Sequence, residues 1–226
     1  MTKEELYEWF LEENKKASIH ILSEGTLEDN KKARHDYKVV HGRSIDYAIS
    51  CDKDWKTFMI DTLSNIKIEY SETEFKNIAD NLPFHDFHWG WFNKYRCLTG
   101  SNYDWFYIIA DDKVQAVCIT YHPKISLFDK QNIFYIEYIA VAPWNRKSNF
   151  IERIYNGLGT LLIKSICHFF HDMQHYRYGF SLSAVPQAKG FYESIGMTSF
   201  PEYDHHNLFF YEIDEKNTVS FLGGAE

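Results

Sequence analysis

Two glycines in the second half of the chain could bind a phosphate group. Gly157 and Gly159 stand between a strong strand pattern, residues 132–143, and a helix predicted over residues 157–173. The N–H groups at the start of a helix are unpaired and lie at the positive end of its dipole, and glycine lets an anion approach the backbone closely. A Gly-x-Gly pair also suits a tight turn, so this pattern alone leaves both interpretations open.

A carboxylate within an apolar strand is the second candidate for chemistry. Glu137 lies in NIFYIEYIAVAP, the clearest strand pattern of the chain, on the same face as Tyr135, Ile139 and Val141. An unpaired carboxylate is costly to bury, so Glu137 is a candidate general base. The alternative is a Glu137 that is salt-bridged, or reached by solvent where neighbouring strands part.

Three histidines fall on one face of the predicted helix over residues 157–173 and its end. His168, His171 and His175 have the spacing of metal ligands, although the opposite face carries the apolar stripe of the helix. A solvated polar face is the simpler interpretation. We therefore expect no metal site.

A second histidine group lies in the aromatic-rich segment FHDFHWGWFNKYRCL, residues 84–98. His85 and His88, next to Trp89, could act as a base or ligate a metal. The alternative is that the aromatic residues simply pack against a sheet.

Composition limits what kind of protein this is. The 226 residues are 45% hydrophobic, enough for one large domain, or one domain with an appendage. With 24 Lys+Arg against 32 Asp+Glu the net charge is −8, which argues against binding nucleic acid through a broad basic face. The start of the chain is charged and no uncharged run is long enough for a membrane span, so we expect a soluble, cytoplasmic protein that does not bind a membrane.

The residues that could do chemistry must be held by a series of strands and helices. We expect strands over residues 46–50, 65–70, 105–110, 113–123, 132–143, 178–185 and 207–214. We expect helices over residues 3–17, with an N-cap at Thr2, and over 54–65, 71–82, 157–173 and 186–196, and a polar loop over 23–38. From residue 65 this order predicts an α+β protein whose mixed sheet has helices on both faces.

One further segment favours the interpretation of the glycine pair as a phosphate-binding turn. AKGFYESIGM, residues 188–197, resembles the A-x-x-F-Y-x-x-x-G-F signature of the GNAT superfamily of acyl-CoA-dependent N-acyltransferases, with V-x-P-x-x-R at residues 141–146 before Gly-x-Gly. The resemblance covers about residues 65–214. It implies a GNAT-like fold, a central mixed and mostly antiparallel sheet flanked by helices. We therefore divide the chain into an N-terminal helical extension of unknown role, 1–64, and an acyltransferase domain, 65–226.

The resemblance implies roles for particular residues. Tyr192 matches the tyrosine that protonates the departing CoA thiolate, and its alternative is a core tyrosine with a satisfied hydroxyl. Glu137 matches the region where many relatives carry an acid, and His85, His88 and Trp89 would wall the acceptor pocket. The residues that would bind the pantetheine and pyrophosphate of CoA are Ile139, Ala140, Val141, Arg146, Gly157, Leu158, Gly159 and Thr160.

Two departures from the family pattern affect this transfer of roles. About eight extra residues, SNFIERIY, separate Arg146 from the glycine pair. Either Arg146 keeps its contact with the pyrophosphate and the insertion loops out, or Arg153 substitutes. Val185 stands where many relatives carry an asparagine.

The resemblance implies direct transfer of an acetyl group from acetyl-CoA to a primary amine, with backbone amides near Val141 polarising the thioester carbonyl. The acceptor would be a small-molecule or peptide amine, and a homodimer would be compatible with the family. One alternative is a catalytically inactive CoA-binding module that acts as a sensor or partner-binding protein. Another is an unrelated α+β protein with a chance motif match.

Overall fold

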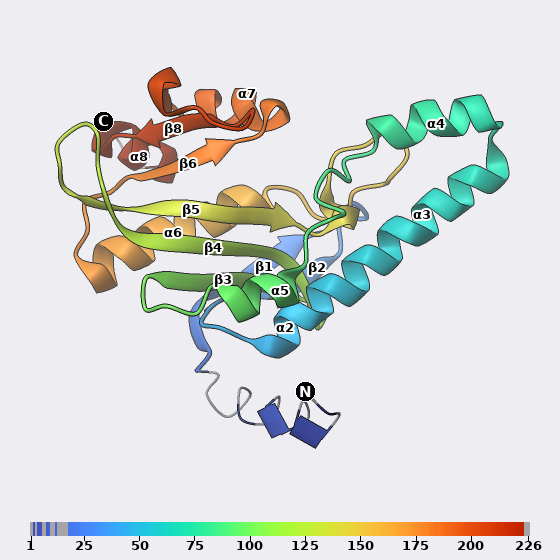
Figure 1. Cartoon of the computed structure of the whole chain (residues 1–226), viewed down its shortest axis with the longest axis horizontal. Coiled ribbons are helices and arrows are strands. Elements are labelled where there is room, and N and C mark those ends of the chain that lie inside the picture. The colour runs from blue at the N-terminus through green and yellow to red at the C-terminus, as the bar shows by residue number, and fades with distance from the viewer. Residues whose placement is uncertain (1, 3, 6–7, 10–11, 13–17, 224–226) are drawn as a thin grey trace. The chain divides into compact units, whose positions relative to one another are not determined.

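A computed structural model describes residues 2, 4–5, 8–9, 12 and 18–223 (Figure 1). The helix expected over residues 3–17 lies largely outside the described residues. Its expected cap is present: the Thr2 hydroxyl accepts a hydrogen bond from the Glu5 N–H at 3.1 Å, and the Thr2 N–H donates to the Glu5 carboxylate at 2.7 Å. Such a reciprocal pair satisfies N–H groups that the start of a helix leaves unpaired.

Eight strands form one sheet in the order β1-β2-β3-β4-β5-β6-β8-β7. The strands are β1 (His20–Glu28), β2 (Arg34–His41), β3 (Tyr103–Ala110), β4 (Lys113–Ile125), β5 (Asn132–Val141), β6 (Phe180–Ala184), β7 (Thr198–Ser199) and β8 (Phe209–Ile213). β5 pairs with β6 in parallel, whereas β1 with β2, β6 with β8, and β7 with β8 are antiparallel. The predicted fold class, an α+β protein with a mixed and mostly antiparallel sheet and helices, is confirmed.

The helices of the described chain vary widely in length. They are α2 (Ile45–Ser50), a π-helix (Cys51–Trp55), α3 (Lys56–Glu69), α4 (Glu72–Asn81), α5 (Trp91–Cys97), α6 (Leu158–Gln174), α7 (Lys189–Ser194) and α8 (Glu215–Leu222), with short 3-10 turns at Pro143–Asn145, Pro186–Ala188 and Pro201–Tyr203. α4 begins with a capping box, in which the Ser71 N–H donates to the Glu74 carboxylate at 3.1 Å. A tight hairpin joins β3 and β4. Its loop residues Asp111 and Asp112 have φ of 51° and 56°, the left-handed backbone that a two-residue hairpin loop requires.

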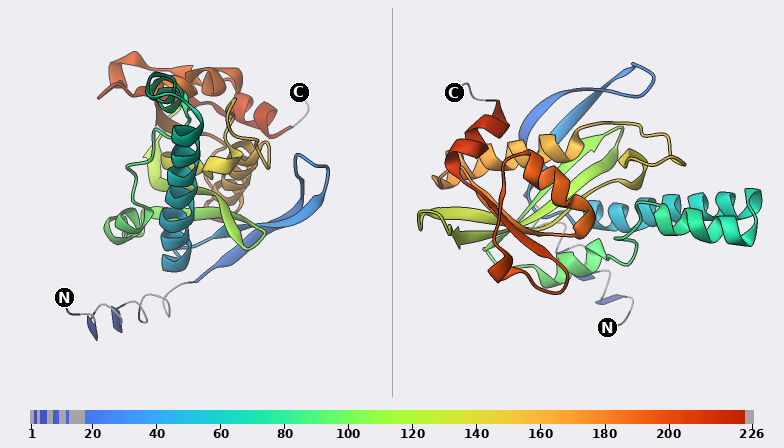
Figure 2. Two further views of the ribbon diagram at one scale, coloured as in Figure 1. Left: turned by 90° about the vertical axis from the view of Figure 1, so that its right-hand side faces the viewer. Right: turned by 90° about the horizontal axis from the view of Figure 1, so that it is seen from above.

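The chain folds as two compact units. The first contains the described residues up to Thr99, with Tyr107–Ala116 and Val141–Leu158. In it α3 and α4 run antiparallel, side by side (Figures 1 and 2). Their facing sides bury a cluster made of Ile66, Ile78, Leu82 and Ile151.

The second unit contains Gly100–Phe106, Val117–Ala140 and the chain from Gly159 onward. Here the apolar stripe of α6 packs against strands of the sheet. The Phe170 ring stacks on Phe134 with ring centroids 4.5 Å apart, and the Phe169 ring meets Phe106 edge-on at 5.2 Å. The C-terminal part of α6 is thereby fixed relative to β5 of the same unit by aromatic packing.

The loop expected over residues 23–38 is wrong, because these residues form most of the hairpin of β1 and β2, visible in Figure 2. Within residues 23–38 exposed residues of the strands alternate with half-buried ones, and the buried residues of β2, Val39 and Val40, follow this stretch. A stretch of strand without a buried face needs no apolar alternation, so this part of the sequence shows none. The turn is held by Asp29, whose carboxylate accepts hydrogen bonds from the Lys31 and Ala33 N–H groups, each at 2.8 Å.

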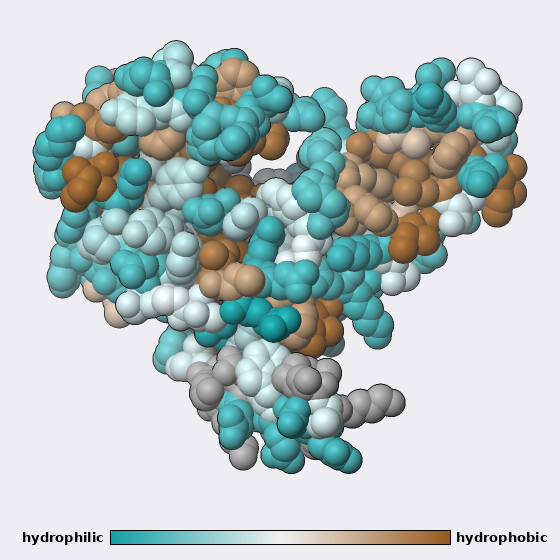
Figure 3. Space-filling view, viewed as in Figure 1, coloured by the Kyte–Doolittle hydropathy of each residue, from teal (hydrophilic) through white to brown (hydrophobic). Residues whose placement is uncertain are grey.

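Two expected strands are helical. Residues 46–50 belong to α2, whose N-cap Ser44 accepts a hydrogen bond from the Tyr47 N–H. Residues 65–69 continue α3 rather than begin a strand. In this segment Ile66 is 7% exposed, whereas Ile68 is 83% exposed. The alternation of apolar and polar residues that suggested a strand arose because Ile68 is an apolar residue on the solvent side of the helix. Figure 3 shows apolar surface over the helix pair formed by α3 and α4.

The N-terminal region, residues 1–64, is therefore not a purely helical extension, because it also contains the β1–β2 hairpin. Its expected boundary at residue 64 falls within α3. That residues 1–64 act as a separate functional region stays a prediction. None of the helices in the described part of the chain has the length and apolarity of a membrane span. The four cysteines, Cys51, Cys97, Cys118 and Cys167, carry free thiols.

Candidate functional site

The β5 strand extends beyond its pairing with β6. Parallel pairing joins Phe134–Ile136 of β5 to Phe180–Leu182 of β6. After the last pair β5 continues through Val141, so residues 137–140 lie outside the ladder with β6. Backbone groups at this edge of the strand are in a position to pair with an extended ligand, as an added strand would.

Glu137 is the first residue of β5 after that last pair. Its side chain is exposed, so solvent reaches it, which is one of the two alternatives considered above. Two tyrosines of the same unit lie near its carboxylate. Burial first and the charge of Glu137 second raise the pKa of Tyr103 and of Tyr138. A carboxylate that is both accessible and close to protonated phenols can accept a proton from a bound amine or from a water molecule.

Tyr192 lies on α7 and is 7% exposed. Its ring packs against those of Phe191 and Tyr211. Burial raises the pKa of Tyr192 well above its usual value, so its hydroxyl stays protonated at neutral pH. Within the described part of the chain, this hydroxyl has no hydrogen-bond partner. Which of the two expected roles Tyr192 has stays a prediction.

The start of α6 has the geometry that close approach of an anion requires. Gly157 has a φ of +73°, and a Cβ added there would meet no atom within 4 Å. Leu158 begins the helix and is buried, whereas Gly159 and Thr160 in its first turn are half-buried. α6 spans 17 residues, so the first-turn N–H groups carry the positive end of a substantial dipole.

Arg146 is already engaged by protein groups. Its guanidinium makes a bidentate ion pair with the Asp86 carboxylate, with N–O distances of 2.5 and 2.7 Å. It also donates to the carbonyl oxygens of Val141 at 2.9 Å and Pro83 at 2.7 Å. Arg146 thus ties the segment before α5 to the end of β5.

The insertion between Arg146 and Gly157 is anchored at two points rather than looped out. Ile151 is buried in the cluster between α3 and α4, and Tyr155 is 1% exposed. The Tyr155 N–H donates to the Asn145 side chain at 3.0 Å. Between these anchors the guanidinium of Arg153 donates to the Asn156 side chain at 2.7 Å, close to the start of α6.

His85, His88 and Trp89 lie in a turn that follows Pro83, and both histidine side chains are exposed. The turn is held at Asp86 by Arg146, as described above. The ammonium of Lys94 lies 4.9 Å from the centre of the Trp89 ring. Their expected place at an acceptor pocket stays a prediction.

The three histidines on and just after α6 lie in different surroundings. His171 stacks on Tyr178, with ring centroids 3.9 Å apart, and bonds to the Tyr176 carbonyl, whereas His168 and His175 are exposed. Among the described residues no group of three or more His, Cys, Asp or Glu side chains is arranged to hold a metal.

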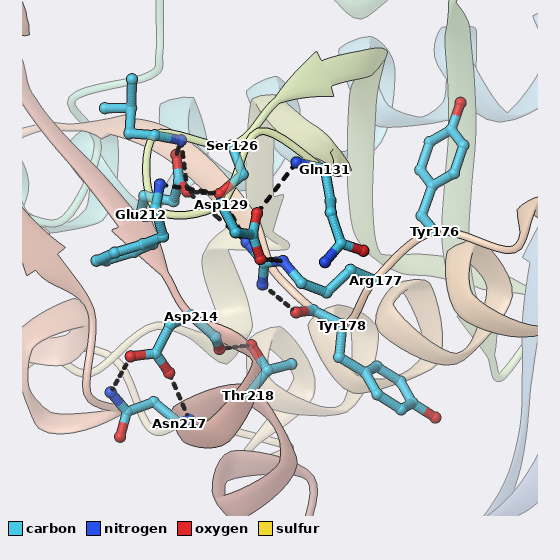
Figure 4. A network of polar contacts seen from close by, with 12 residues as sticks. Ser126, Asp129, Gln131, Tyr176, Arg177, Tyr178, Glu212, Asp214, Asn217 and Thr218 are labelled. Carbon is cyan, nitrogen blue, oxygen red and sulfur yellow. Dashed lines mark hydrogen bonds and ion pairs between the residues drawn. The ribbon is translucent and has the colours of Figure 1, made fainter.

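Sequence reasoning missed a buried ionic network in the second unit (Figure 4). Glu212 on β8 is 0% exposed and accepts hydrogen bonds from the Ser126 hydroxyl at 2.6 Å and the Leu127 N–H at 3.0 Å. Arg177 donates to Ser126 at 2.8 Å and pairs with Asp129 at 2.7 Å. The network fastens the β4–β5 loop to β8. Its only sequence signal was a charged residue within the apolar strand NLFFYEID.

A second missed cluster lies in the first unit. The His35 ring stands between two carboxylates, with Nδ1 2.9 Å from Asp111 and Nε2 3.2 Å from Asp29. The Tyr155 hydroxyl donates to the other oxygen of Asp111. The hydrogen bond to Asp111 raises the pKa of His35, against a smaller effect of desolvation, and the bond to Asp29 adds to it.

No family model and no curated protein matches the sequence. Among solved structures, the chain is similar to an uncharacterized protein from Bacillus halodurans, with a TM-score of 0.54 and 9% identity over 90% of this chain and 96% of that one. It is also similar to the PaiA N-acetyltransferase of Thermoplasma acidophilum in complex with coenzyme A, with a TM-score of 0.46 and 12% identity over 79% and 98% of the two chains. For the N-acetyltransferase PseH of Campylobacter jejuni the TM-score is 0.38 and the identity 13%, over 65% and 93%.

These similarities concern the fold. The class that the architecture defines is an α+β fold with a mixed sheet, as expected from the sequence. One fold can carry many different chemistries, so the function depends on this chain's own residues.

Proposed function

We propose that the chain is an acyl-CoA-dependent N-acyltransferase that transfers an acetyl group from acetyl-CoA to a primary amine. The observation that carries this proposal is the end of β5, which leaves its ladder with β6 after Ile136 and continues to Val141. The open space at Gly157 supports it. So does the hydroxyl of Tyr192, which lacks a protein partner among the described residues.

In the proposed reaction the amine nitrogen forms a bond to the thioester carbonyl carbon, the carbon–sulfur bond breaks, and sulfur leaves with the electron pair. Glu137, or a water molecule that it holds, accepts the proton that the nitrogen loses. The Tyr192 hydroxyl donates a hydrogen bond to the sulfur. Because the pKa of Tyr192 is raised, complete proton transfer from the phenol to a thiolate is uphill, so stabilisation by a hydrogen bond is the larger part of this role.

The cofactor is proposed to bind along β5 and at the start of α6. Backbone groups of Ile139, Ala140 and Val141 would pair with the pantetheine arm, and an N–H near Val141 would polarise the thioester carbonyl. The N–H groups of Gly157–Thr160 would hold the pyrophosphate. Since Arg146 is engaged by Asp86, Arg153 is the better placed of the two arginines to meet a phosphate.

The proposal is tested first by binding. Coenzyme A in millimolar excess should raise the melting temperature of the full chain, because a ligand of the folded state stabilises it by mass action. Gly157→Val should abolish the shift, since its branched side chain would enter the space at the helix start. Gly157→Asn is the matched control for the backbone, because asparagine tolerates a left-handed φ. The absence of any shift in the wild-type protein would contradict the proposal.

Turnover separates an enzyme from a binding module. Release of the CoA thiol, followed with acetyl-CoA and a panel of small-molecule and peptide amines, should depend on the amine. A protein that is stabilised by CoA but turns over no amine would be the sensor or partner-binding module of the alternative hypothesis. A cytoplasmic location, the absence of nucleic-acid and membrane partners, and a homodimeric state remain parts of the proposal.

A further inference from the structure

A cavity of about 510 Å³ lies in the first unit, and none of the residues assigned to the cofactor or acceptor lines it. It is bounded by the helical segment 53–61, by the turn between β3 and β4, and by residues that follow β5. Its lining includes two aromatic residues and four charged ones: Phe58, Trp144, Lys53, Asp54, Asp61 and Lys113. Its volume is within the range of small-molecule sites.

The floor of the cavity is aromatic and firmly held. The rings of Phe58 and Trp144 meet edge-on, with centroids 5.6 Å apart. The indole N–H of Trp144 donates to the side-chain oxygen of Gln115 at 2.8 Å, and the Asn145 amide donates to the same oxygen at 2.8 Å. Because the polar atom of the indole is satisfied within the protein, the floor offers a ligand apolar ring surface of fixed orientation.

The rim of the cavity carries both signs of charge. Asp54 and Asp61 stand seven positions apart on one side of the helical segment, roughly 10 Å along its axis, with Phe58 between them. Neither carboxylate has a hydrogen bond or ion pair among the residues that the structure describes. Lys53 and Lys113 supply the positive charges, and the Lys113 ammonium lies 5.7 Å from the centre of the Trp144 ring.

Asp111 also lines the cavity, but its carboxylate is occupied by His35 and Tyr155. The charges left for a ligand are therefore two carboxylates and two ammonium groups above an apolar floor. A simple cation would leave the lysines without a counter-charge, and a simple anion would face Asp54 and Asp61. A ligand with an ammonium, a carboxylate and an apolar body satisfies all three features.

We propose that this cavity binds a free amino acid with a large apolar side chain, in its zwitterionic form. The side chain would lie on Phe58 and Trp144, with the ammonium toward Asp54 and Asp61 and the carboxylate toward Lys53 and Lys113. This site is separate from the proposed transferase function and does not depend on it.

The test is calorimetric titration of the full chain with L-phenylalanine and with two analogues that each lack one charge. Phenethylamine has no carboxylate, and 3-phenylpropanoate has no ammonium. We expect phenylalanine to bind at least about tenfold more tightly than either analogue, since each hydrogen bond to a charged group contributes about that factor.

Two exposed rim residues provide complementary variants. Asp61→Asn should weaken binding of phenylalanine and phenethylamine about tenfold and leave 3-phenylpropanoate unchanged. Lys113→Met should weaken phenylalanine and 3-phenylpropanoate and leave phenethylamine unchanged. Asp80→Asn and Lys76→Met, exposed on α4 outside the cavity, are the matched controls and should alter none of the three.

Phenethylamine that binds as tightly as phenylalanine would overturn the proposal in favour of a cation site. So would a failure of phenylalanine, tryptophan and leucine to bind at millimolar concentration. The stabilisation by CoA in Asp61→Asn should equal that of the wild type. A negative titration with an intact CoA response would therefore refute the amino-acid site alone.

Discussion

At the scale of single residues, the burial of Tyr192 determines what its hydroxyl can do. A phenol whose pKa is raised by burial donates a hydrogen bond to a leaving sulfur more readily than it gives up its proton. Tyr192→Phe should therefore keep CoA binding and lower turnover by about 10²-fold, at the lower end of what general-acid assistance contributes. Steady-state rates beside CoA-induced melting shifts measure both effects. An unchanged rate would remove Tyr192 from the mechanism.

Replacement of Glu137 is expected to affect the rate in a different way from replacement of Tyr192, because the effect should depend on pH. Replacing it with glutamine removes the proton acceptor while keeping the size of the side chain. The rate of Glu137→Gln should be depressed at neutral pH and recover in part at high pH, where more of the amine is already deprotonated. Rate against pH for the variant and the wild type is the measurement. A deficit that does not vary with pH would indicate a structural role and make His85 or His88 the next candidate for the base.

The sequence could indicate Tyr192 and Gly157 because each sits in a local motif. It could not indicate what Arg146 binds, since its partner Asp86 is 60 positions away in the chain and is one acidic residue among many. The same reason hid the contact of His35 with Asp111, which is 76 positions away in the chain. Long-range polar pairs leave no periodic trace in a sequence.

At the scale of elements, the Arg146–Asp86 pair is expected to hold the turn before α5 against the end of β5. Side chains of both residues are about one-tenth exposed, and removing one partner of such a pair leaves the other charge without compensation. Asp86→Asn should lower the free energy of unfolding by about 3 kcal/mol. Denaturant unfolding measures this loss.

Arg146→Lys is the matched variant, because it keeps the charge but loses the bidentate geometry. If Arg146 acted on the pyrophosphate instead, Arg146→Lys would weaken CoA binding while Asp86→Asn left stability unchanged. A double-mutant cycle with both replacements gives the coupling between them, which should account for most of either single loss.

Long elements with a continuous apolar stripe or run were predictable, whereas short helices such as α2 and α5 were missed although each buries two residues. The buried stripe of α6 and the apolar run of β5 determine their own patterns. By contrast β1 and β2 expose both faces in part, and the end of α3 places Ile68 in solvent. The expected cap was more reliable than the alternation, because the Thr2 hydroxyl does accept a hydrogen bond from the Glu5 N–H at 3.1 Å.

At the scale of the whole molecule, a net charge of −8 makes stability depend on pH. Self-repulsion among carboxylates increases as the remaining positive groups lose their protons. His35 is one of those groups, and it joins the β1–β2 turn to the β3–β4 turn through Asp29 and Asp111. Its charge is therefore expected to contribute to the stability of the first unit.

The hydrogen bond to Asp111 raises the pKa of His35 in the folded state above the unfolded value of about 6.5. A raised folded-state pKa gives stability that is fully present below the unfolded value and is lost as pH rises through the folded value. The difference in melting temperature between the wild type and His35→Gln should thus be largest in mild acid and shrink toward alkaline pH. His85→Gln, an exposed histidine with no ion pair among the described residues, is the control and should show no such trend. A difference for His35→Gln that stays constant from acid to alkaline pH would mean that His35 stabilises the hairpin by packing on Tyr155, whose ring it meets edge-on at 5.6 Å, and not by its charge.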